Sequence, residues 1–397
     1  MTAPFPCRLS RPGVVCSLGG DEAAIAHALF AGERGLTMSD LFTPGRPLPL
    51  GQVDASLPDD RDWPTPHRSR NNRLLAHALA QLEPEIASAM ARWPSSRIGV
   101  VIGTSTSGIG ETELALAASG REGPLPATFD YARQELGAPA RFIAERLSLD
   151  GPCYALSTAC SSSARALASA RRLLKSGQCD AVIAGGADSL CKLTVNGFSS
   201  LDAVSDRPSH PFSAHRDGIN LGEAAALFVV TSESGGIQLA GAGESADAHH
   251  ISAPRPDGSG AVDAMRQALD MAGLAPGDID YLNLHGTGTP LNDAMESAAV
   301  TALFPTPPAC SSTKALTGHT LGAAGALEAA FCWLALTHAR LPRHVFDGDE
   351  DPDIASLPLI TAPVERPLRH ALSSSFAFGG SNASLLLSRT DTPEDDS

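Results

Sequence analysis

Short apolar runs that end in glycine recur along this 397-residue chain, and helical patterns separate them. The runs lie at 97–108, 179–188, 225–230, 279–290 and 382–388, and the helical patterns at 71–92, 132–147, 161–176, 260–273, 292–303 and 322–338. A continuous apolar run bounded by glycine is typical of a strand that is buried on both faces. Alternation of such strands with helices predicts an α/β protein with mostly buried sheets.

The chain is longer than a single core usually requires, which favours two cores or one duplicated core. The small polar stretch "TSESGG" at 231–236 precedes a new strand-like run, "IQLAGAG". We therefore expect an N-terminal half at 1–234 and a C-terminal half at 235–397, with a similar βα rhythm in each. The last nine residues, "RTDTPEDDS", contain no apolar side chain and are expected to be disordered.

Composition excludes several classes of protein. The net charge of −15 argues against a nucleic-acid surface, which needs a basic face. None of the eight cysteines forms a C-x-x-C pair, so we expect no zinc site. The N-terminus lacks the pattern of a signal peptide, and the most apolar helix contains Glu328 and is too short to span a bilayer. We expect a cytoplasmic protein with reduced thiols and no membrane span.

Cys160 lies in the stretch "ALSTACSSSARALASARRLLKSG", between a strand-like run and a helical pattern that Gly177 could terminate. This places Cys160 at a helix N-terminus, where unpaired N–H groups favour a thiolate and are expected to lower the pKa from about 8.5. An isolated cysteine is more often a buried structural residue, which is our interpretation of Cys153, Cys179 and Cys332. Cys160 is the candidate nucleophile.

Two histidines lie in glycine-rich frames. His285, in "NLHGTGTPLND", ends a predicted buried strand, where α/β proteins bind ligands. His319, in "KALTGHTLGAAG", follows Lys314 by five residues and precedes Glu328 by nine. Either histidine alone is also consistent with a turn or core residue. The adjacent pair at 249–250 lacks a spaced carboxylate or cysteine, and we assign it no metal.

A third glycine-rich turn, "FAFGGSN", carries Phe376 and Phe378 ahead of the last predicted strand. Glycines at this place allow backbone amides to approach a ligand closely. The same pattern is consistent with a tight loop packed by two aromatic rings.

Together these frames resemble the β-ketoacyl-acyl carrier protein synthases, the Cys-His-His condensing enzymes of fatty-acid and polyketide assembly. The motifs "TACSSS", "HGTGTP", "KALTGHTLGAAG" and "FAFGGSN" stand in the family's order, and the resemblance runs from about residue 10 to residue 388. It implies the thiolase fold, in which two duplicated α/β halves form a five-layered αβαβα sandwich, usually as a dimer.

The resemblance also implies a mechanism. Cys160 accepts an acyl group from an acyl carrier protein, and the backbone amides of Cys160 and Phe378 form the oxyanion hole. His285 and His319 then stabilise the enolate formed when malonyl carrier protein loses carbon dioxide. The carbanion attacks the acyl-cysteine, which elongates a fatty-acid, polyketide or aryl polyene chain by two carbons. No cofactor is implied, because the phosphopantetheine of the carrier protein holds the substrates.

Further positions match the family's pattern and receive their roles from it. The pair Lys314 and Glu328 is expected to lie behind the reacting groups and to orient His319, and Phe378 is also expected to gate the cavity. The remaining expectations are Thr287 and Thr289 for pantetheine binding, Ile109 and Phe198 for the acyl pocket, and Arg68, Arg70 and Arg73 for docking of the acidic carrier protein. A solvated helix edge is an equal interpretation of the three arginines.

Several alternatives remain open. A thiolase needs a second cysteine where this chain offers Phe378, and the ketosynthases that prime chains from coenzyme A have asparagine in place of His319. A cysteine hydrolase would not explain the second histidine. A chain-length factor, the non-catalytic partner of a ketosynthase heterodimer, usually lacks the nucleophile.

The stretches "HRSRNNRLLAHAL" and "GTSTSGIGETE" are similar to aryl polyene ketosynthases. Acyl chain length and the choice between homodimer and heterodimer are not determined by the sequence.

Overall fold

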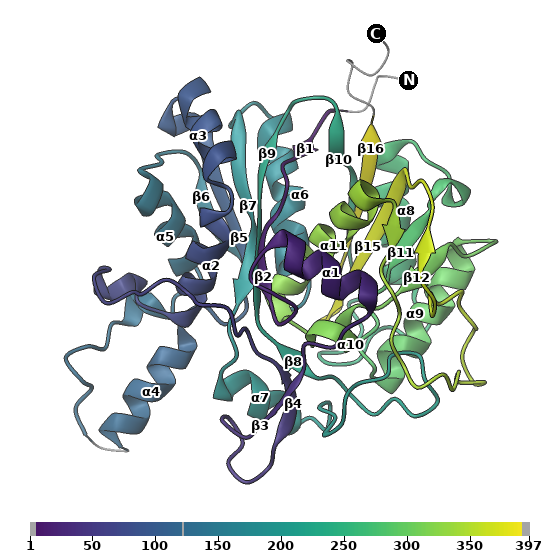
Figure 1. Cartoon of the computed structure of the whole chain (residues 1–397), viewed down its shortest axis with the longest axis horizontal. Coiled ribbons are helices and arrows are strands. Elements are labelled where there is room, and N and C mark those ends of the chain that lie inside the picture. Colours follow the sequence, from purple (N-terminus) through teal and green to yellow (C-terminus); the bar gives the residue numbers. More distant parts are fainter. Residues whose placement is uncertain (1–4, 121–122, 391–397) are drawn as a thin grey trace.

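The N-terminal half of the protein is built on five strands, seen in a computed structural model that describes residues 5–120 and 123–390. They lie in the order β6-β5-β7-β9-β2 (Figure 1). Their bounds are β2 (Gly13–Cys16), β5 (Ile98–Gly103), β6 (Cys153–Leu156), β7 (Ala181–Asp188) and β9 (Ala224–Thr231). β6, β5 and β7 are parallel to one another, and β9 is antiparallel to both β7 and β2.

The C-terminal half repeats this arrangement, in the order β12-β11-β15-β16-β10. Its strands are β10 (Gly236–Ala246), β11 (Tyr281–Asn283), β12 (Ala309–Ser311), β15 (His370–Ala377) and β16 (Ser381–Thr390). β12, β11 and β15 are parallel, and β16 is antiparallel to β15 and β10. The short strand β1 (Arg8–Leu9) pairs with both β9 and β10 and joins the two halves. The same strand order and directions in both halves define a duplicated fold.

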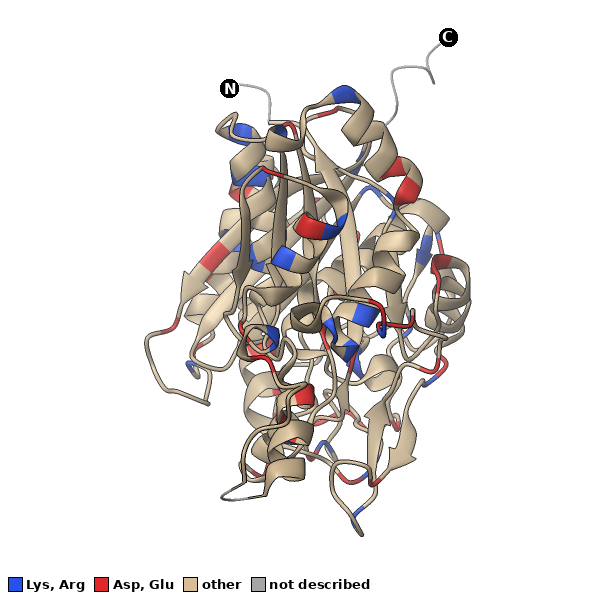
Figure 2. Ribbon diagram, turned by 90° about the vertical axis from the view of Figure 1, so that its left-hand side faces the viewer, with Lys and Arg blue, Asp and Glu red and all other residues tan. Residues whose placement is uncertain are grey.

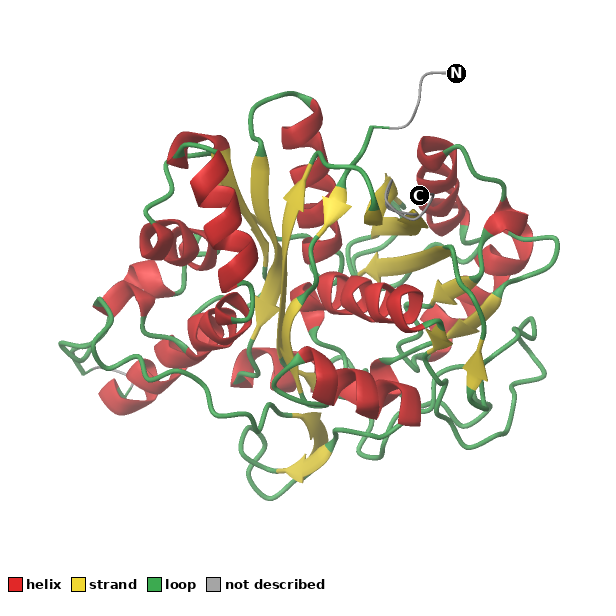
Figure 3. Ribbon diagram, turned by 45° about the horizontal axis from the view of Figure 1, so that its top comes forward, coloured by secondary structure: helices red, strands yellow, loops and turns green. Residues whose placement is uncertain are grey.

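Two helices occupy the centre of the molecule, between the two halves. α6 (Ser162–Lys175) packs on β5 and β7 of its own half and reaches β10 and β16 of the other half. α11 (Ala324–His338) packs on β15 and β16 and also contacts β7 and β9. The outer faces are covered by α2 (Arg70–Ala80) and α5 (Ala138–Leu147) on one side and by α8 (Ser259–Ala272) and α9 (Pro290–Leu303) on the other (Figures 1 and 3). The result is the five-layered αβαβα sandwich of the thiolase fold.

The remaining elements decorate this core. The helices are α1 (Glu22–Ala31), α3 (Glu83–Arg92), α4 (Ile109–Ser119), α7 (Lys192–Ser199) and α10 (Lys314–Thr317), and the short strands are β3 (Thr37–Ser39), β4 (Leu48–Gly51), β8 (Leu221–Gly222), β13 (Arg340–Leu341) and β14 (Val364–Glu365). α4 projects from one side of the body (Figure 1). The expectation that the most apolar helix is too short to span a bilayer is wrong: Leu321–His338 is, alone among the described residues, long and apolar enough to do so, and 83% of it is buried inside the fold.

The predicted strands and central helices are confirmed, and the differences have local causes. The helical pattern at 71–92 is two helices: Pro84, in the first turn of α3, has no amide proton to continue α2, which ends at Ala80. The predicted helix at 132–147 begins only at Ala138, after a single 3-10 turn. Arg389 and Thr390, expected in the disordered tail, belong to β16, where they pair with β10. The rest of that tail, 391–397, lies outside the described residues.

A substitution at Gly103, at the end of β5, tests how closely the central helix α6 approaches the sheet. A Cβ atom there would lie 2.3 Å from the Ser163 amide nitrogen and 2.4 Å from its Cα atom. We expect Gly103→Ala to lower the free energy of unfolding by about 3 kcal/mol, because neither backbone can yield cheaply. Urea unfolding followed by far-UV circular dichroism measures it. Gly197→Ala in α7 is the matched control, since a Cβ there meets nothing within 4 Å; it should stabilise by about 0.5–1 kcal/mol.

Candidate active site

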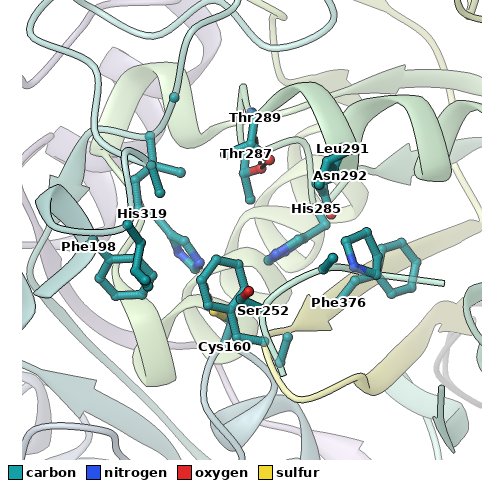
Figure 4. A pocket seen from close by; sticks show the side chains of 18 of the residues that line it. Cys160, Phe198, Ser252, His285, Thr287, Thr289, Leu291, Asn292, His319 and Phe376 are labelled. Carbon is teal, nitrogen blue, oxygen red and sulfur yellow. Dashed lines mark hydrogen bonds between the residues drawn. The ribbon is translucent and has the colours of Figure 1, made fainter. Parts of the chain in front are cut away.

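The carboxyl ends of the central strands meet at one cavity, and the predicted site residues gather there. Cys160 follows β6, His285 follows β11, and His319 lies between β12 and α11. All three line the cavity, together with Phe198, Thr287, Thr289, Phe376 and Phe378 (Figure 4). Cys160 and His319 occupy corresponding places in the two halves, because each precedes a central helix that follows the third strand of its half.

The corner that carries Cys160 is held in a strained conformation. Ala159 has φ +51°, a left-handed value that is rare for a residue other than glycine. The Ser162 hydroxyl stabilises this corner by donating to the Ala159 carbonyl at 2.5 Å and accepting from the Thr158 amide at 2.9 Å. α6 begins at Ser162, so the predicted position of Cys160 at a helix N-terminus is confirmed.

Cys160, His319 and His285 form a compact group. The His319 Nε2 atom lies 3.0 Å from the Cys160 Sγ atom, and the two imidazole centroids are 5.3 Å apart at 84°. The Leu321 backbone N–H donates to His319 Nδ1 at 3.3 Å, so a neutral His319 carries its proton on Nε2. That N–H group therefore points toward the sulfur and the cavity.

Burial controls the ionisation of Cys160. It raises the pKa of the thiol to about 11, against the positive charge of Lys314 and a hydrogen bond from the Phe378 amide, which both lower it. Our expectation of a lowered pKa is therefore wrong. The helix N-terminus is present, but removal of the sulfur from water outweighs the groups that favour the thiolate. The resting site holds a thiol.

Both histidines are neutral near pH 7. Burial holds the pKa of His285 and of His319 well below 6.5. The positive charge of Lys314 lowers both pKa values further, by a smaller amount. Lys314 itself is buried and forms an ion pair with Glu328, so the two members of the predicted pair are in contact. The burial of this pair keeps its positive charge near the imidazoles without exposing it in the cavity.

Sequence reasoning missed two carboxylates beneath the His285 turn. The Glu296 carboxylate accepts the backbone N–H groups of His285 and Gly286, each at 2.7 Å, and Asp293 accepts that of Gly288 at 3.2 Å. Burial raises the pKa of Glu296 to about 8. The signal was available in "HGTGTPLNDAME", where two acids three residues apart share the face of a helix that follows the turn.

The entrance of the cavity combines hydroxyl groups, aromatic rings and exposed aliphatic side chains. The Thr287 and Thr289 hydroxyls lie 2.9 Å apart. The Phe198 and Phe378 rings face one another with centroids 5.5 Å apart. Across residues 5–120 and 123–390, neither the Cys160 nor the Phe378 amide donates to a backbone carbonyl oxygen; the Phe378 amide donates to the Cys160 sulfur instead.

The structure does not support carrier-protein docking by the three arginines. Arg70 forms an ion pair with the buried Glu223, Arg68 Nε donates to the Trp63 carbonyl at 2.6 Å, and Arg73 Nε donates to a loop carbonyl at 2.7 Å. Because all three guanidinium groups are half-buried and bound within the chain, they hold loops in place. Ile109, predicted in the acyl pocket, starts α4 and does not line the cavity of the single chain, whereas Phe198 does.

Two groups of side chains have the spacing of a metal site within the described part of the chain. One is Cys160 with His285 and His319, and the other is the exposed group His215, Asp347 and Asp349; in each, the ligand atoms lie within 4.8 Å of one another. We assign no metal ion to either group, and the expectation of a metal-free protein stays a prediction.

Comparison with known proteins identifies the family. Residues 73–235 match the family model "Beta-ketoacyl synthase, N-terminal domain", and residues 237–346 match "Beta-ketoacyl synthase, C-terminal domain". The chain is 33% identical to 3-oxoacyl-[acyl-carrier-protein] synthase 2 of Rhizobium meliloti, over 86% of this chain and 87% of that protein. It is 40% identical to the mitochondrial 3-oxoacyl-[acyl-carrier-protein] synthase of Arabidopsis thaliana, over 62% of this chain and 58% of that protein's length.

Solved structures agree with this relationship. The ketosynthase ApeO of Xenorhabdus doucetiae, in complex with its chain length factor ApeC, superimposes with a TM-score of 0.92 at 44% identity, over 97% of this chain and 98% of that one. The ishigamide ketosynthase/chain length factor gives 0.89 at 27% identity, over 98% and 100%. The chain belongs to the β-ketoacyl synthase family. It is a ketosynthase, a condensing acyltransferase.

Alkylation of Cys160 tests its ionisation. Because its pKa is raised to about 11, the rate of reaction with iodoacetamide should rise about tenfold per pH unit from pH 7 to pH 10 without reaching a plateau. Peptide mass spectrometry resolves Cys160 from the exposed Cys153. A plateau below pH 8 would show that the helix N-terminus outweighs burial.

Proposed function

We propose that this ketosynthase is a 3-oxoacyl-acyl carrier protein synthase in which Cys160 holds the growing chain. It would catalyse the decarboxylative Claisen condensation of a malonyl group with the acyl group on Cys160, and extend the chain by two carbons. The observation that carries the proposal is the position of Cys160 Sγ, 3.0 Å from His319 Nε2 and hydrogen-bonded by the Phe378 amide.

In the first half-reaction, the Cys160 sulfur attacks the thioester carbonyl of an acyl carrier protein. The bond between acyl carbon and pantetheine sulfur breaks, and the thiol proton ends on the departing pantetheine. The Cys160 amide, which donates to no carbonyl oxygen of the described residues, and the Phe378 amide, which bonds the Cys160 sulfur in the resting site, support an oxyanion hole at this point; preorganised donors of this kind contribute about 3–4 kcal/mol each.

In the second half-reaction, a malonyl group enters and loses carbon dioxide. The enolate oxygen accepts hydrogen bonds from the imidazoles of His285 and His319, and the carbanion attacks the acyl-cysteine carbonyl. The bond between the acyl carbon and the Cys160 sulfur then breaks, and the thiolate that leaves takes up a proton from solvent. Neutral imidazoles suit this step, because two adjacent imidazolium ions would repel each other. The buried Lys314–Glu328 pair adds positive charge near the developing anion without contacting it.

The carrier arm supplies the substrates, so the proposal includes no cofactor and no metal. Thr287 and Thr289 line the entrance and present hydroxyls suited to the amides of phosphopantetheine. Phe378, packed against Phe198, is proposed as the gate between the entrance and the acyl pocket.

Docking of the carrier protein is proposed at an aliphatic rim made of Leu201, Ile251 and Leu291. These side chains are 58%, 81% and 63% exposed; Leu201 and Leu291 line the cavity, and Ile251 directly precedes the lining residue Ser252. Arg207 and Arg255 lie close in sequence to lining residues of the cavity; each is paired with a carboxylate and remains largely open to solvent. Apolar side chains flanked by guanidinium groups suit an acidic partner with an apolar contact surface.

The partner subunit is proposed to be a second chain of the same fold, with a chain-length-factor-like paralogue favoured over a second copy. In the part of the chain that the structure describes, β6 pairs only with β5 and leaves a sheet edge open, and α4 exposes Leu114 and Leu116. Acidic and basic residues are interspersed on the side of α3, α4 and α5 (Figure 2). The complex of ApeO with its chain length factor supports the heterodimer. The similarity of two stretches to aryl polyene ketosynthases supports a cytoplasmic pathway of that type.

Intact-protein mass spectrometry tests the nucleophile. The native protein, alone and co-expressed with candidate partners, is incubated with a panel of acyl carrier proteins. A gain equal to one acyl group, absent in Cys160→Ala, is expected, because only a thioester on that sulfur survives. The exposed Cys153 gives the matched control, and Cys153→Ala should load normally. If no acyl carrier loads the native protein in any combination, a non-catalytic subunit is the better interpretation.

Steady-state kinetics test the rim. Ile251→Asp should raise the KM for the acyl carrier protein about tenfold and leave kcat nearly unchanged, because it places a charge in the apolar contact outside the reacting cavity. Met271→Asp, at an exposed site on α8, is the control and should change neither constant. An unchanged KM for Ile251→Asp would exclude docking at this rim.

A further inference from the structure

Asp188 is a fully buried carboxylate for which the reaction described above has no role. It ends β7 at the edge of the sheet that faces the cavity. Its Oδ1 atom accepts hydrogen bonds from the Thr104 hydroxyl at 2.7 Å, the Ser105 amide at 2.8 Å, and the Thr106 amide and hydroxyl at 2.8 Å each. Its Oδ2 atom accepts from the Gly322 amide at 2.6 Å and the Ser105 amide at 3.0 Å. The carboxylate therefore joins the loop after β5 to the other half of the molecule.

The duplication of the fold explains why Asp188, in the N-terminal half, bonds a residue of the C-terminal half. β7 is the fourth strand of the N-terminal half and β15 is the fourth strand of the C-terminal half. Just beyond β15, the Phe378 amide bonds the Cys160 sulfur at the start of α6. At the end of β7, Asp188 bonds the Gly322 amide at the start of α11. In both halves, the end of the fourth strand holds the turn that begins the opposite central helix.

The turn that Asp188 holds is the one that orients His319. It runs from Thr320 to Ala323, and Leu321 adopts φ +53°, a strained value for a branched side chain. The Leu321 amide donates to His319 Nδ1 and so fixes the proton on Nε2. Gly322 lets the carboxylate approach, because a Cβ atom there would lie 2.7 Å from Asp188 Oδ2.

The same carboxylate also reaches the corner of Cys160. It fixes the Ser105 amide, and the Ser105 hydroxyl donates to the Ala159 carbonyl at 3.4 Å. The Asp188 carboxylate therefore connects the two turns that carry His319 and Cys160. Every group around it is an N–H or O–H donor, which requires an acceptor at both oxygens.

We propose that Asp188 is a positioning residue that sets the distance and the tautomer of His319 relative to Cys160, and that it acts on the condensation step rather than on acyl loading. The inference rests on the proposed function, in which His319 acts on the enolate and the amides of Cys160 and Phe378 act on the first oxyanion. Loss of the hydrogen bond between the Gly322 amide and the Asp188 carboxylate then impairs only the second half-reaction.

Asp188→Asn tests the proposal with a nearly isosteric change. The oxygen of the new side-chain amide should remain with the four donors at the Oδ1 position, so that its NH₂ group faces the Gly322 N–H and two donors oppose each other. We expect kcat for condensation to fall about 10–100-fold, the KM for malonyl carrier protein to stay constant, and the rate of acyl loading to be almost unchanged. Hydrogen exchange of the 319–324 segment should accelerate, whatever the activity.

Two further variants keep the test decisive. Gly322→Ala pushes on the same contact from the other side without altering charge, and it should reproduce the same split between loading and condensation. Asp180→Asn, just before the same strand and paired with Arg97 at the surface, should leave both rates unchanged. The amplitude of acyl loading counts the folded enzyme, so unfolding of either variant is recognised directly.

The outcomes separate this inference from the proposed function. If the native protein loads and condenses, and Asp188→Asn and Gly322→Ala do the same, Asp188 has no positioning role. Equal losses of loading and condensation would show a purely structural role and also overturn it. If the native protein itself does not load, the proposed function fails. In that case unchanged hydrogen exchange of 319–324 in Asp188→Asn would show that the bond between Asp188 and Gly322 does not hold this turn. Faster hydrogen exchange would show that it does.

Discussion

The close packing of α6 against α11 at their N-terminal ends is the contact on which the site depends. A Cβ atom on Gly325 would lie 2.7 Å from the Ala164 Cβ atom, and the Ser163 hydroxyl accepts the Ala326 amide at 2.8 Å. No larger residue fits at that crossing. Because each helix begins beside a site residue, this contact brings Cys160 and His319 together from two halves of the chain that are separate in sequence.

Several buried charges near the cavity are bound to partners within the protein. Lys314 is paired with Glu328, and backbone amides bind the Asp188 carboxylate. Removal of either member of a buried pair costs about 3–5 kcal/mol. At the reacting groups the cavity presents the Cys160 thiol and two neutral imidazoles, and its lining also includes the carboxyl groups of Asp202, Asp217 and Asp247. The neutral imidazoles can donate hydrogen bonds to an anion that exists only during the reaction.

The sequence predicts the strand ends and the reactive side chains because those depend on local patterns. Apolar runs followed by glycine mark the exits of β5 and β7, and His285 directly follows the apolar run of β11. No local pattern marks Asp188, because the role we propose for it depends on a hydrogen bond to Gly322, 134 positions away. The arginines at the start of α2 are a basic cluster in sequence, but only the folded chain shows that carbonyl groups and Glu223 bind them. The prediction of a lowered pKa for Cys160 was wrong for a related reason: a helix N-terminus can be recognised in the sequence, but the depth of burial cannot.

Burial of Cys160 has a consequence for the lifetime of the enzyme. At a pKa of about 11, only about one molecule in ten thousand carries the thiolate at pH 7. Peroxides attack the thiolate, and oxidation beyond the sulfenic acid destroys a thiol permanently. A sulfur held as a buried thiol therefore reacts more slowly with peroxides than an exposed, acidic cysteine does.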